Sequence, residues 1–552
     1  MELGVYSFGD VQRDTVTGKL GSTAEATRNL LEAIQLADQV GLDYFGIGEH
    51  HTREMPASAA AVVLGAAAST TKNIKLGSAV TVLSTDDPVR VYQQFATLDA
   101  LSNGRAEITA GRGSSTESFP LFGHSLNDYD ELYAEKLDLL LKINESESIT
   151  WSGKHRPALD NALVVPRPES GSLPIWLATG GNPQSSVRAG LLGLPISYAI
   201  IGGQAARFAP LAELYRRAAA QGKFPEAQMK ISVASPGYVG DDAKRAKEQF
   251  WVHWHAIMET IGKVRGFAPP RRRRSPSASS RCTGAWGICA SSSRWMWGKC
   301  RKKTSCARLN YSAPASSRWS TPNSEQTTPS RRKVMRATDV QTIGILGAGR
   351  VGTALARRAI AAGYEVRIAT SKPPEDIALL LEIMAPGAKA GSVEAVIDAG
   401  DIVVLALPLS RYRALQADLF EGKIVVDVMN YWAPTDGTIV EFEGQASSSE
   451  VIQDYLPGAR LVRSFNHMGY HEIDEEARLI GHPDRRALAL AGNDPQARAV
   501  VADFIDRLGF DPVDAGELAA SQGFATGTPV FGATLGRETM KQLLREQDAY
   551  AA

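Results

Sequence analysis

Two groups of residues in this chain have types and spacings that indicate chemistry. Gly347, Gly349 and Gly352 form the pattern G-A-G-R-V-G, and His50 and His51 end the pattern G-E-H-H. Glycine-rich turns at the start of a helix bind phosphate through backbone N–H groups, and histidine exchanges protons near neutral pH. We therefore expect a phosphate site in the C-terminal half. In the N-terminal half we expect a catalytic or hydrogen-bonding role for at least one of the two histidines, the alternative for either being a packed histidine at a rim.

The elements around the glycine pattern are those of a dinucleotide-binding βαβ unit. A strand over 342–346 precedes it, and a helix over 354–362 and a second strand over 365–370 follow it. Because the second strand ends in hydroxyls and a lysine instead of an acid, NADP is predicted over NAD; the alternative is that this lysine is a solvated loop residue. The predicted nucleotide-binding residues are Gly347, Ala348, Gly349, Arg350, Val351, Gly352, Thr370, Ser371 and Lys372.

The first 270 residues alternate apolar strand patterns with amphipathic helix patterns. Strands are expected over 3–8, 43–48, 74–82, 105–110, 174–179, 195–201 and 230–234, and the helices between them include 23–39, 88–101, 128–142 and 205–220. Seven such alternations predict a parallel (β/α)8 barrel of the TIM type that lacks its eighth strand. The whole chain is thus expected to be an incomplete barrel followed by a Rossmann-like domain.

Four motifs lie at the predicted carboxyl ends of barrel strands, the face where such barrels build active sites. They cover residues 48–51, 77–91, 103–115 and 178–186. In this order and spacing they resemble the bacterial luciferase-like, flavin-dependent monooxygenase family. The resemblance implies that the barrel binds FMN or coenzyme F420 at its mouth and, in oxygen-using members, transfers an oxygen atom to a small-molecule substrate. The candidates for contacts with the coenzyme phosphate are Gly113, Ser114, Gly180 and Gly181.

The C-terminal half resembles the NADP-dependent F420 reductase family over about residues 340–535. Beside the glycine pattern, the resemblance rests on the segments 461–469, 491–494 and 507–518. It implies direct hydride transfer between the nicotinamide and F420 or another flavin. It also implies that Leu407 and Pro408 border the nicotinamide, that Asn430 holds its ribose or carboxamide, and that His467 lines the acceptor side. His467 is the catalytic candidate here and either steers an acidic coenzyme tail or caps a buried turn.

Residues 271–334 differ from both halves, with fifteen Lys or Arg, a single acidic residue and all four cysteines. A nucleic-acid-binding arm, a disordered linker and an out-of-frame translation are the three interpretations. Reading residues 291–319 from the last base of each preceding codon permits a string containing V-L-R-S-I-E-L-F-G, the amphipathic helix that the barrel lacks. The predicted organisation is therefore a barrel over 1–270, an out-of-frame or disordered linker over 271–334, and an NADP-binding domain over 335–552.

Composition limits the remaining classes of function. Sixty basic residues balance sixty acidic ones, which argues against nucleic acid or an anionic membrane as the partner. No apolar run has the length of a membrane span, and the cysteine spacing lacks the C-x2-C pattern of a zinc site, so a cytoplasmic protein without a metal is expected. We expect an oxidoreductase fusion, and the two resemblances imply a homodimer, which both families commonly form. The alternative is an NADP(H)-binding sensor without turnover attached to an inactive barrel remnant.

Overall fold

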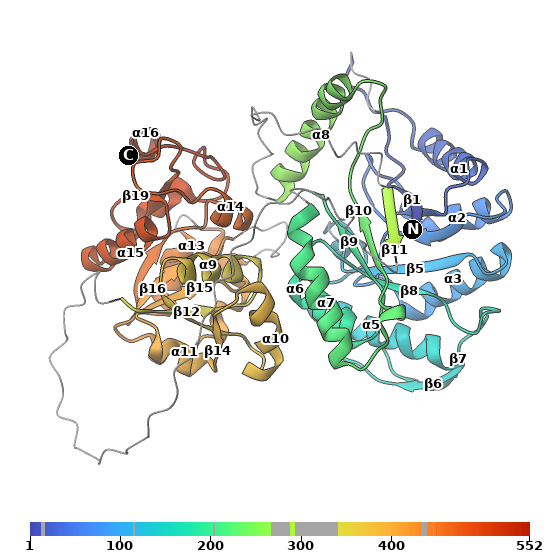
Figure 1. Ribbon diagram of the computed structural model, residues 1–552, viewed down its shortest axis with the longest axis horizontal. Helices are drawn as coiled ribbons and strands as arrows, with labels where there is room; N and C mark the ends of the chain where they lie inside the picture. Colours follow the sequence, from blue (N-terminus) through green and yellow to red (C-terminus); the bar gives the residue numbers. More distant parts are fainter. Residues whose placement is uncertain are drawn as a thin grey trace, which may run out of the picture.

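A computed structural model describes residues 1–12, 17–113, 116–201, 205–265, 288–292, 340–431, 439–444 and 447–551 of the chain. The chain builds two α/β units, each around its own large sheet. Figure 1 shows the first unit in blue to green and the second in yellow to red. In the described part of the chain, no helix combines the length and the apolar character that crossing a membrane would require.

The first unit is a barrel of mainly parallel strands. Its strands are β1 (Glu2–Ser7), β2 (Tyr44–Ile47), β3 (Lys75–Ser78), β4 (Thr81–Val82), β5 (Ala106–Gly111), β8 (Ile175–Thr179), β9 (Ile196–Ala199), β10 (Ile231–Ala234) and β11 (Ile288–Ser292). Neighbours from β1 round to β10 run parallel, and β3 pairs with β5 as well as with β2. The predicted barrel is thereby confirmed, with each of its seven expected strands in place.

The gap between β1 and β10 is filled by a strand that the sequence pattern did not predict. β11 is antiparallel to both neighbours, and Ala290 lies opposite Leu3 on one side and Val233 on the other. Unpaired strand edges present unsatisfied backbone groups, so β11 relieves the cost that an open barrel would carry. Residues 288–292 belong to the basic segment and yet complete the ring of strands.

Helices cover the outside of the barrel, and their sequences explain where they begin and which side they bury. In α1 (Thr23–Gln39), Ser22 caps the first turn by accepting from the Glu25 amide, and the buried residues recur at helical spacing on one face. The other barrel helices are α2 (Ala60–Ala68), α3 (Pro88–Ser102), α4 (Ser118–Leu121), α5 (Tyr129–Glu145), α6 (Pro183–Leu191), α7 (Ala209–Gln221) and α8 (Ala243–Arg265). An antiparallel hairpin of β6 (Ser148–Trp151) and β7 (Leu159–Leu163) is inserted after α5 and was not predicted.

The second unit has a six-stranded sheet in the order β14-β13-β12-β15-β16-β17, with all neighbours parallel. Its strands are β12 (Thr342–Leu346), β13 (Glu365–Ala369), β14 (Lys389–Ala390), β15 (Ile402–Leu405), β16 (Ile424–Asp427) and β17 (Arg460–Arg463). Numbered along the chain this is the 3-2-1-4-5-6 order of a Rossmann fold. β15 and β16 are buried at every position, as expected for strands with helices on both faces. The predicted dinucleotide fold is confirmed.

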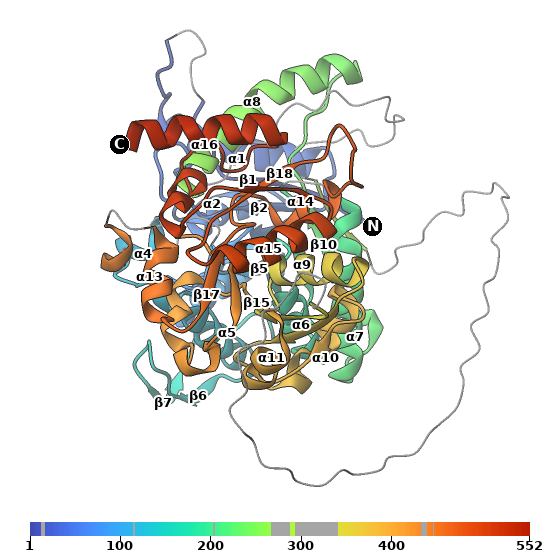
Figure 2. The same cartoon turned by 90° about the vertical axis from the view of Figure 1, so that its left-hand side faces the viewer.

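Helices flank this sheet, and Figure 2 shows α10 and α11 together below it and α15 above them. They are α9 (Arg350–Ala361), α10 (Pro374–Met384), α11 (Val393–Ala399), α13 (Ser448–Tyr455), α14 (Tyr470–Glu475), α15 (Pro495–Arg507) and α16 (Arg537–Ala551). Beyond β17, β18 (Ala487–Leu490) and β19 (Asp511–Asp514) form a separate parallel pair. A single antiparallel bridge between Arg463 and Ala491 connects this pair to the main sheet.

The two units touch through α6 and α7 of the barrel and α10 of the second unit. Leu214 on α7 is completely buried and belongs to the apolar core of the C-terminal unit. Beside it, the guanidinium of Arg217 donates to both carboxylate oxygens of Glu382 at 2.8 Å. The contact therefore combines an apolar centre with a polar edge.

Candidate active sites

The glycine pattern of the second unit forms a tight turn between β12 and α9. Gly347 has a φ of +121°, and a Cβ there would lie 2.2 Å from the carbonyl oxygen of Ala406. A Cβ at Gly352 would lie 2.0 Å from the carbonyl oxygen of Gly347. Within the described part of the chain, a Cβ at Gly349 would meet nothing within 4 Å. Packing thus requires glycine at 347 and 352, whereas the space above Gly349 is open in the described part of the chain.

This turn suits a pyrophosphate group. Gly349 is the N-cap of α9 and supplies no side chain to its first turn, so the amides of Arg350 and Val351 receive no side-chain cap. Ala348 is buried beneath the turn. The turn lies where the strand order reverses between β12 and β15, the place where doubly wound sheets bind nucleotides. The residues present therefore fit a dinucleotide.

The end of β13 lies beside the glycine turn, because β12 and β13 are parallel neighbours. Thr370 is half-buried, Ser371 and Lys372 are exposed, and the Lys372 amide donates to Thr370 Oγ1 at 3.1 Å. One short turn thus holds two hydroxyls and an ammonium group, and no carboxylate from this turn opposes them. That set fits the 2′-phosphate of NADP.

Three further predicted residues follow the strands on the other side of the switch point. Leu407 is half-buried and Pro408 is exposed after β15, and the close approach of Gly347 to Ala406 places both beside the glycine turn. Asn430 follows β16 and is half-buried. These placements agree with a nicotinamide that crosses from the glycine turn toward β16.

The catalytic prediction for His467 needs correction. Its side chain is fully buried, its Nε2 accepts from the Ala489 amide at 3.1 Å, and its Nδ1 lies 3.1 Å from Asn466 Oδ1. Burial, together with the nearby positive charge of Arg486, lowers the pKa of His467 well below its usual value. A neutral ring with both nitrogens engaged supports the buried turn, which is the structural alternative left open by the sequence.

The sequence reasoning missed a buried ionic network beside Asn430. Asp427 ends β16, Arg463 ends β17, and their side chains meet at 2.7 Å with almost no exposure. Arg463 also donates to Asn430 Oδ1 at 3.0 Å. Two oppositely charged residues at the ends of apolar strands were the available signal, but their pairing required that β16 and β17 be known as neighbours.

At the mouth of the barrel, His50 and His51 each face a carboxylate. Nδ1 of His50 lies 2.9 Å from Glu117, which follows β5, and Nε2 of His51 lies 2.9 Å from Glu49. The second oxygen of Glu49 accepts from the Val82 amide at 2.8 Å. Glu49 therefore pairs with His51 and with the backbone of the loop that contains β4.

The contacts at the mouth shift the pKa values of His51 and Glu117. The hydrogen bond from Glu49 raises the pKa of His51 above its usual value, against the opposing effect of burial. Burial is the largest single influence on Glu117 and would raise its pKa, but the hydrogen bond and charge of His50 together with backbone hydrogen bonds outweigh it and hold that pKa below its usual value. His51 consequently keeps its proton to a higher pH than a free imidazole, which suits a proton donor at the mouth.

The predicted coenzyme-phosphate residues of the barrel lie in loops after the adjacent strands β5 and β8. Gly113 and Gly181 adopt positive φ values of +83° and +100°, and Gly180 is exposed; Ser114 lies outside the described residues. The amides of Gly181 and Asn182 donate to Thr179 Oγ1 at 3.3 and 3.1 Å. This loop therefore offers a phosphate fewer free amides than its glycines suggested.

A buried lysine near the mouth was also missed. Lys136 on α5 is 4% exposed, donates to the carbonyl oxygen of Ser84 at 2.8 Å, and lies 3.3 Å from His124 Nε2. Burial lowers its pKa to about 8, and burial likewise raises the pKa of nearby Asp86. The contacts fasten the segment that carries Glu117 to the loop after β4.

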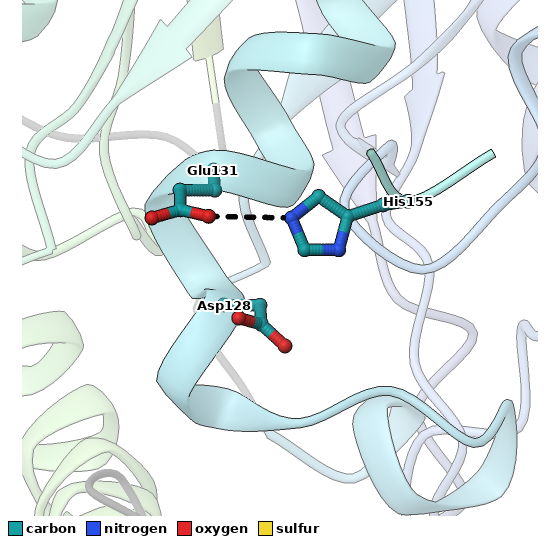
Figure 3. A group of neighbouring side chains, drawn as sticks. All are labelled: Asp128, Glu131 and His155. Atoms are coloured by element: carbon teal, nitrogen blue, oxygen red, sulfur yellow. Dashed lines mark hydrogen bonds and ion pairs between the residues drawn. The ribbon is translucent and has the colours of Figure 1, made fainter. Parts of the chain in front are cut away.

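One cluster has the residue types of a metal site. Figure 3 shows Asp128 and Glu131 at the start of α5 with His155 turned toward Glu131, and their ligand atoms lie within 4.8 Å of one another. However, Lys154 Nζ lies 2.8 Å from Glu131. An ammonium group in this position already neutralises the carboxylate, so we assign no metal here.

Comparison with known families agrees with both resemblances. Residues 1–285 match the family described as luciferase-like monooxygenase, and residues 342–431 match the family described as NADP oxidoreductase, coenzyme F420-dependent. Both are oxidoreductase families, and the second description names NADP and coenzyme F420, two of the predicted cofactors.

Individual relatives cover only part of the chain. The luciferase-like monooxygenase of Escherichia coli K12 is 30% identical over 185 residues, which is 32% of this chain and 51% of that protein. The F420-dependent glucose-6-phosphate dehydrogenase of Amycolatopsis mediterranei is 29% identical and covers 30% of this chain and 52% of its own length. The chain spans about half the length of the curated relatives it matches.

Among solved structures, the monooxygenase RslO1 from Streptomyces bottropensis has a TM-score of 0.41 and 21% identity, covering 45% of this chain and 75% of that one.

Proposed function

The chain belongs to the luciferase-like monooxygenase family, and from both family matches we propose that it is an oxidoreductase. Its C-terminal unit transfers hydride from NADPH to a flavin or deazaflavin such as F420. The barrel binds a flavin-type coenzyme at the face that carries His50 and His51. The observation that carries the proposal is the glycine turn, where two glycines are required by packing and the third leaves open space. Such a division of roles is that of a pyrophosphate-binding loop.

NADPH, when bound, supplies the hydride. The residues of the chain hold and orient it: the amides at the start of α9 hold the pyrophosphate, and Lys372 with its neighbouring hydroxyls takes the 2′-phosphate. Leu407 and Pro408 form an apolar border that keeps water from the nicotinamide. Direct hydride transfer depends on positioning more than on a general acid, so the burial of His467 does not oppose this function.

In the barrel, the proposed contribution of the chain is the proton that His51 retains. Glu49 keeps His51 protonated to a higher pH, and Glu49 is itself fixed by the Val82 amide. His50 and Glu117 form a second pair across the mouth. In this proposal His51 is the proton donor for a substrate that enters beside the flavin.

The experiment that tests the C-terminal function substitutes the open glycine. Gly349→Ala adds a methyl group to the space above the turn without meeting described protein atoms, so folding should be unaffected. We expect NADPH binding, measured by fluorescence titration, to weaken about tenfold or more because the methyl group displaces the pyrophosphate. Gly536→Ala is the matched control, since its Cβ also meets nothing within 4 Å of the described chain.

Turnover is measured separately with the wild-type protein, by following NADPH oxidation with F420, FMN and FAD as acceptors. Reduction of one acceptor supports the proposal. NADPH binding without reduction of any acceptor would instead indicate a sensor, and equal NADPH affinity in Gly349→Ala and wild type would refute the assignment of the glycine turn.

We also propose that residues 271–334 are translated out of frame. A (β/α)8 barrel uses eight parallel strands, whereas the eighth position here is taken by the antiparallel β11 from this segment. Sequencing the DNA across codons 265–340 is the test. A single inserted or deleted base that restores V-L-R-S-I-E-L-F-G is the expected result, and an unbroken frame would refute it.

A further inference from the structure

Asn430 is held by protein contacts that determine which of its atoms can reach a ligand. Its Oδ1 accepts from Arg463 Nη2 at 3.0 Å, and its Nδ2 donates to the carbonyl oxygen of Asn466 at 2.7 Å. An arginine only donates and a backbone carbonyl only accepts, so the amide can have only this orientation. Among the described residues, one N–H of Asn430 is left without a partner.

Arg463 is itself held in place by a buried carboxylate. Its Nη1 donates to Asp427 Oδ2 at 2.7 Å, and that carboxylate also accepts from Ser449 Oγ at 2.6 Å and from the Met429 amide at 2.9 Å. Asp427 and Arg463 are direct register partners at the ends of β16 and β17. Both side chains are buried, so the guanidinium has one available position.

From this arrangement we infer that Asp427 and Arg463 are positioning residues that make Asn430 a hydrogen-bond donor, not an acceptor, toward an oxygen of the nicotinamide half of NADP. The inference rests on the proposed function, because it assigns the ligand beside β16. Asn430 lies at the same edge of the sheet as the glycine turn, on the side of the switch point away from β13. The ligand atom that it recognises is therefore an acceptor oxygen, on the carboxamide or the ribose, and not an N–H.

The test compares two ligands that share the adenosine half. On this inference NADP⁺ reaches Asn430, whereas adenosine 2′,5′-bisphosphate, which lacks the nicotinamide half, does not. In calorimetric titrations, we expect Asn430→Asp to weaken NADP⁺ binding about tenfold, because the substitution keeps the acceptor for Arg463 and removes both N–H groups, the one bound to the Asn466 carbonyl and the one left for the ligand. We expect affinity for adenosine 2′,5′-bisphosphate to stay unchanged.

Arg463→Lys tests the positioning role, since lysine can pair with Asp427 but cannot also bridge to Asn430 in the same geometry. A selective loss of NADP⁺ affinity is expected. Arg460→Lys is the matched control, because Arg460 begins the same strand and pairs with Asp494 at 2.6 Å, far along the strand from Asn430. Circular dichroism and thermal unfolding identify any variant that fails to fold.

The outcomes are distinguishable. Loss of NADP⁺ affinity alone supports the inference. Unchanged affinity in both variants, or equal losses for the two ligands in folded Asn430→Asp, overturns it. If wild-type protein binds neither ligand, the proposed function fails first, and the donor role of Asn430 toward NADP fails with it.

Discussion

Arg350 at the start of α9 donates a hydrogen bond from Nη2 to the carbonyl oxygen of Gly180 in the barrel, at 2.9 Å. The guanidinium also lies over the ring of Tyr470, 5.4 Å from its centre. One residue of the glycine turn thus contacts the loop after β8 of the other unit. The two loops for which coenzyme binding was predicted meet in the folded chain.

Leu214 contributes more to this contact than the ion pair beside it. Burying a leucine contributes about 1.5–3 kcal/mol. The ion pair of Arg217 and Glu382 is exposed and screened by solvent, so it contributes little. We expect Leu214→Glu to separate the units and to increase the radius of gyration in small-angle X-ray scattering. Arg217→Ala is the control and should leave the scattering curve close to that of wild type. An unchanged radius for Leu214→Glu would contradict the interface.

β11 is expected to stabilise the barrel through its backbone. Ala290→Pro removes an N–H from a strand that is paired on both sides, and an unsatisfied partner costs about 1–3 kcal/mol. The melting temperature of the barrel should fall by several degrees, as measured by circular dichroism. Ala290→Ser keeps the N–H and should have a much smaller effect. Equal melting temperatures for the proline variant and wild type would show that β11 does not hold the barrel closed.

The proton on His51 depends on Glu49. Because the hydrogen bond with Glu49 raises the pKa of His51, Glu49→Gln should shift the titration of this ring to lower pH. The stabilisation from the pair is complete at pH below the unfolded value of 6.5 and is lost as pH rises through the folded pKa. NMR titration of the His51 ring protons measures the shift. Glu32→Gln, on the exposed side of α1, should leave the titration unchanged.

His467 should make the stability of the C-terminal unit depend on pH in the opposite direction. Its folded pKa lies well below 6.5, so the unfolded chain binds a proton that the folded chain does not. The free energy of unfolding should therefore decrease as pH falls below about 6.5, the usual value for histidine. Thermal unfolding between pH 5 and 7 measures this, and His467→Gln should flatten the dependence. A variant with the same pH slope as wild type would exclude His467 as its source.

Lys372 should decide between the two nicotinamide coenzymes. Lys372→Glu replaces an ammonium by a carboxylate at the end of β13, which repels a 2′-phosphate and accepts from a 2′-hydroxyl. We expect NADP⁺ affinity to fall about tenfold or more while NAD⁺ affinity is retained or improved. NAD⁺ is the internal control for folding. A parallel loss of both affinities would indicate a structural role for this turn.

The amino-acid sequence determined the elements whose signals are local. The helix over 23–39 was predicted to the residue, because its regular apolar face is contained in one segment. The glycine turn was equally readable, since the demands on Gly347 and Gly352 arise within one βαβ unit. The resemblances to two known families predicted the remaining architecture of both units.

The tertiary structure decided the contacts between residues that are distant in the sequence. The pairing of Asp427 with Arg463 joins residues far apart in the sequence, and only the order of β16 and β17 brings them together. His467 likewise finds a partner only in the folded chain, where the Ala489 amide donates to its ring. β11 has no alternating apolar pattern, so its pairing with β1 could not be predicted from its sequence. A buried polar group must find a partner, but the sequence alone does not say where that partner lies.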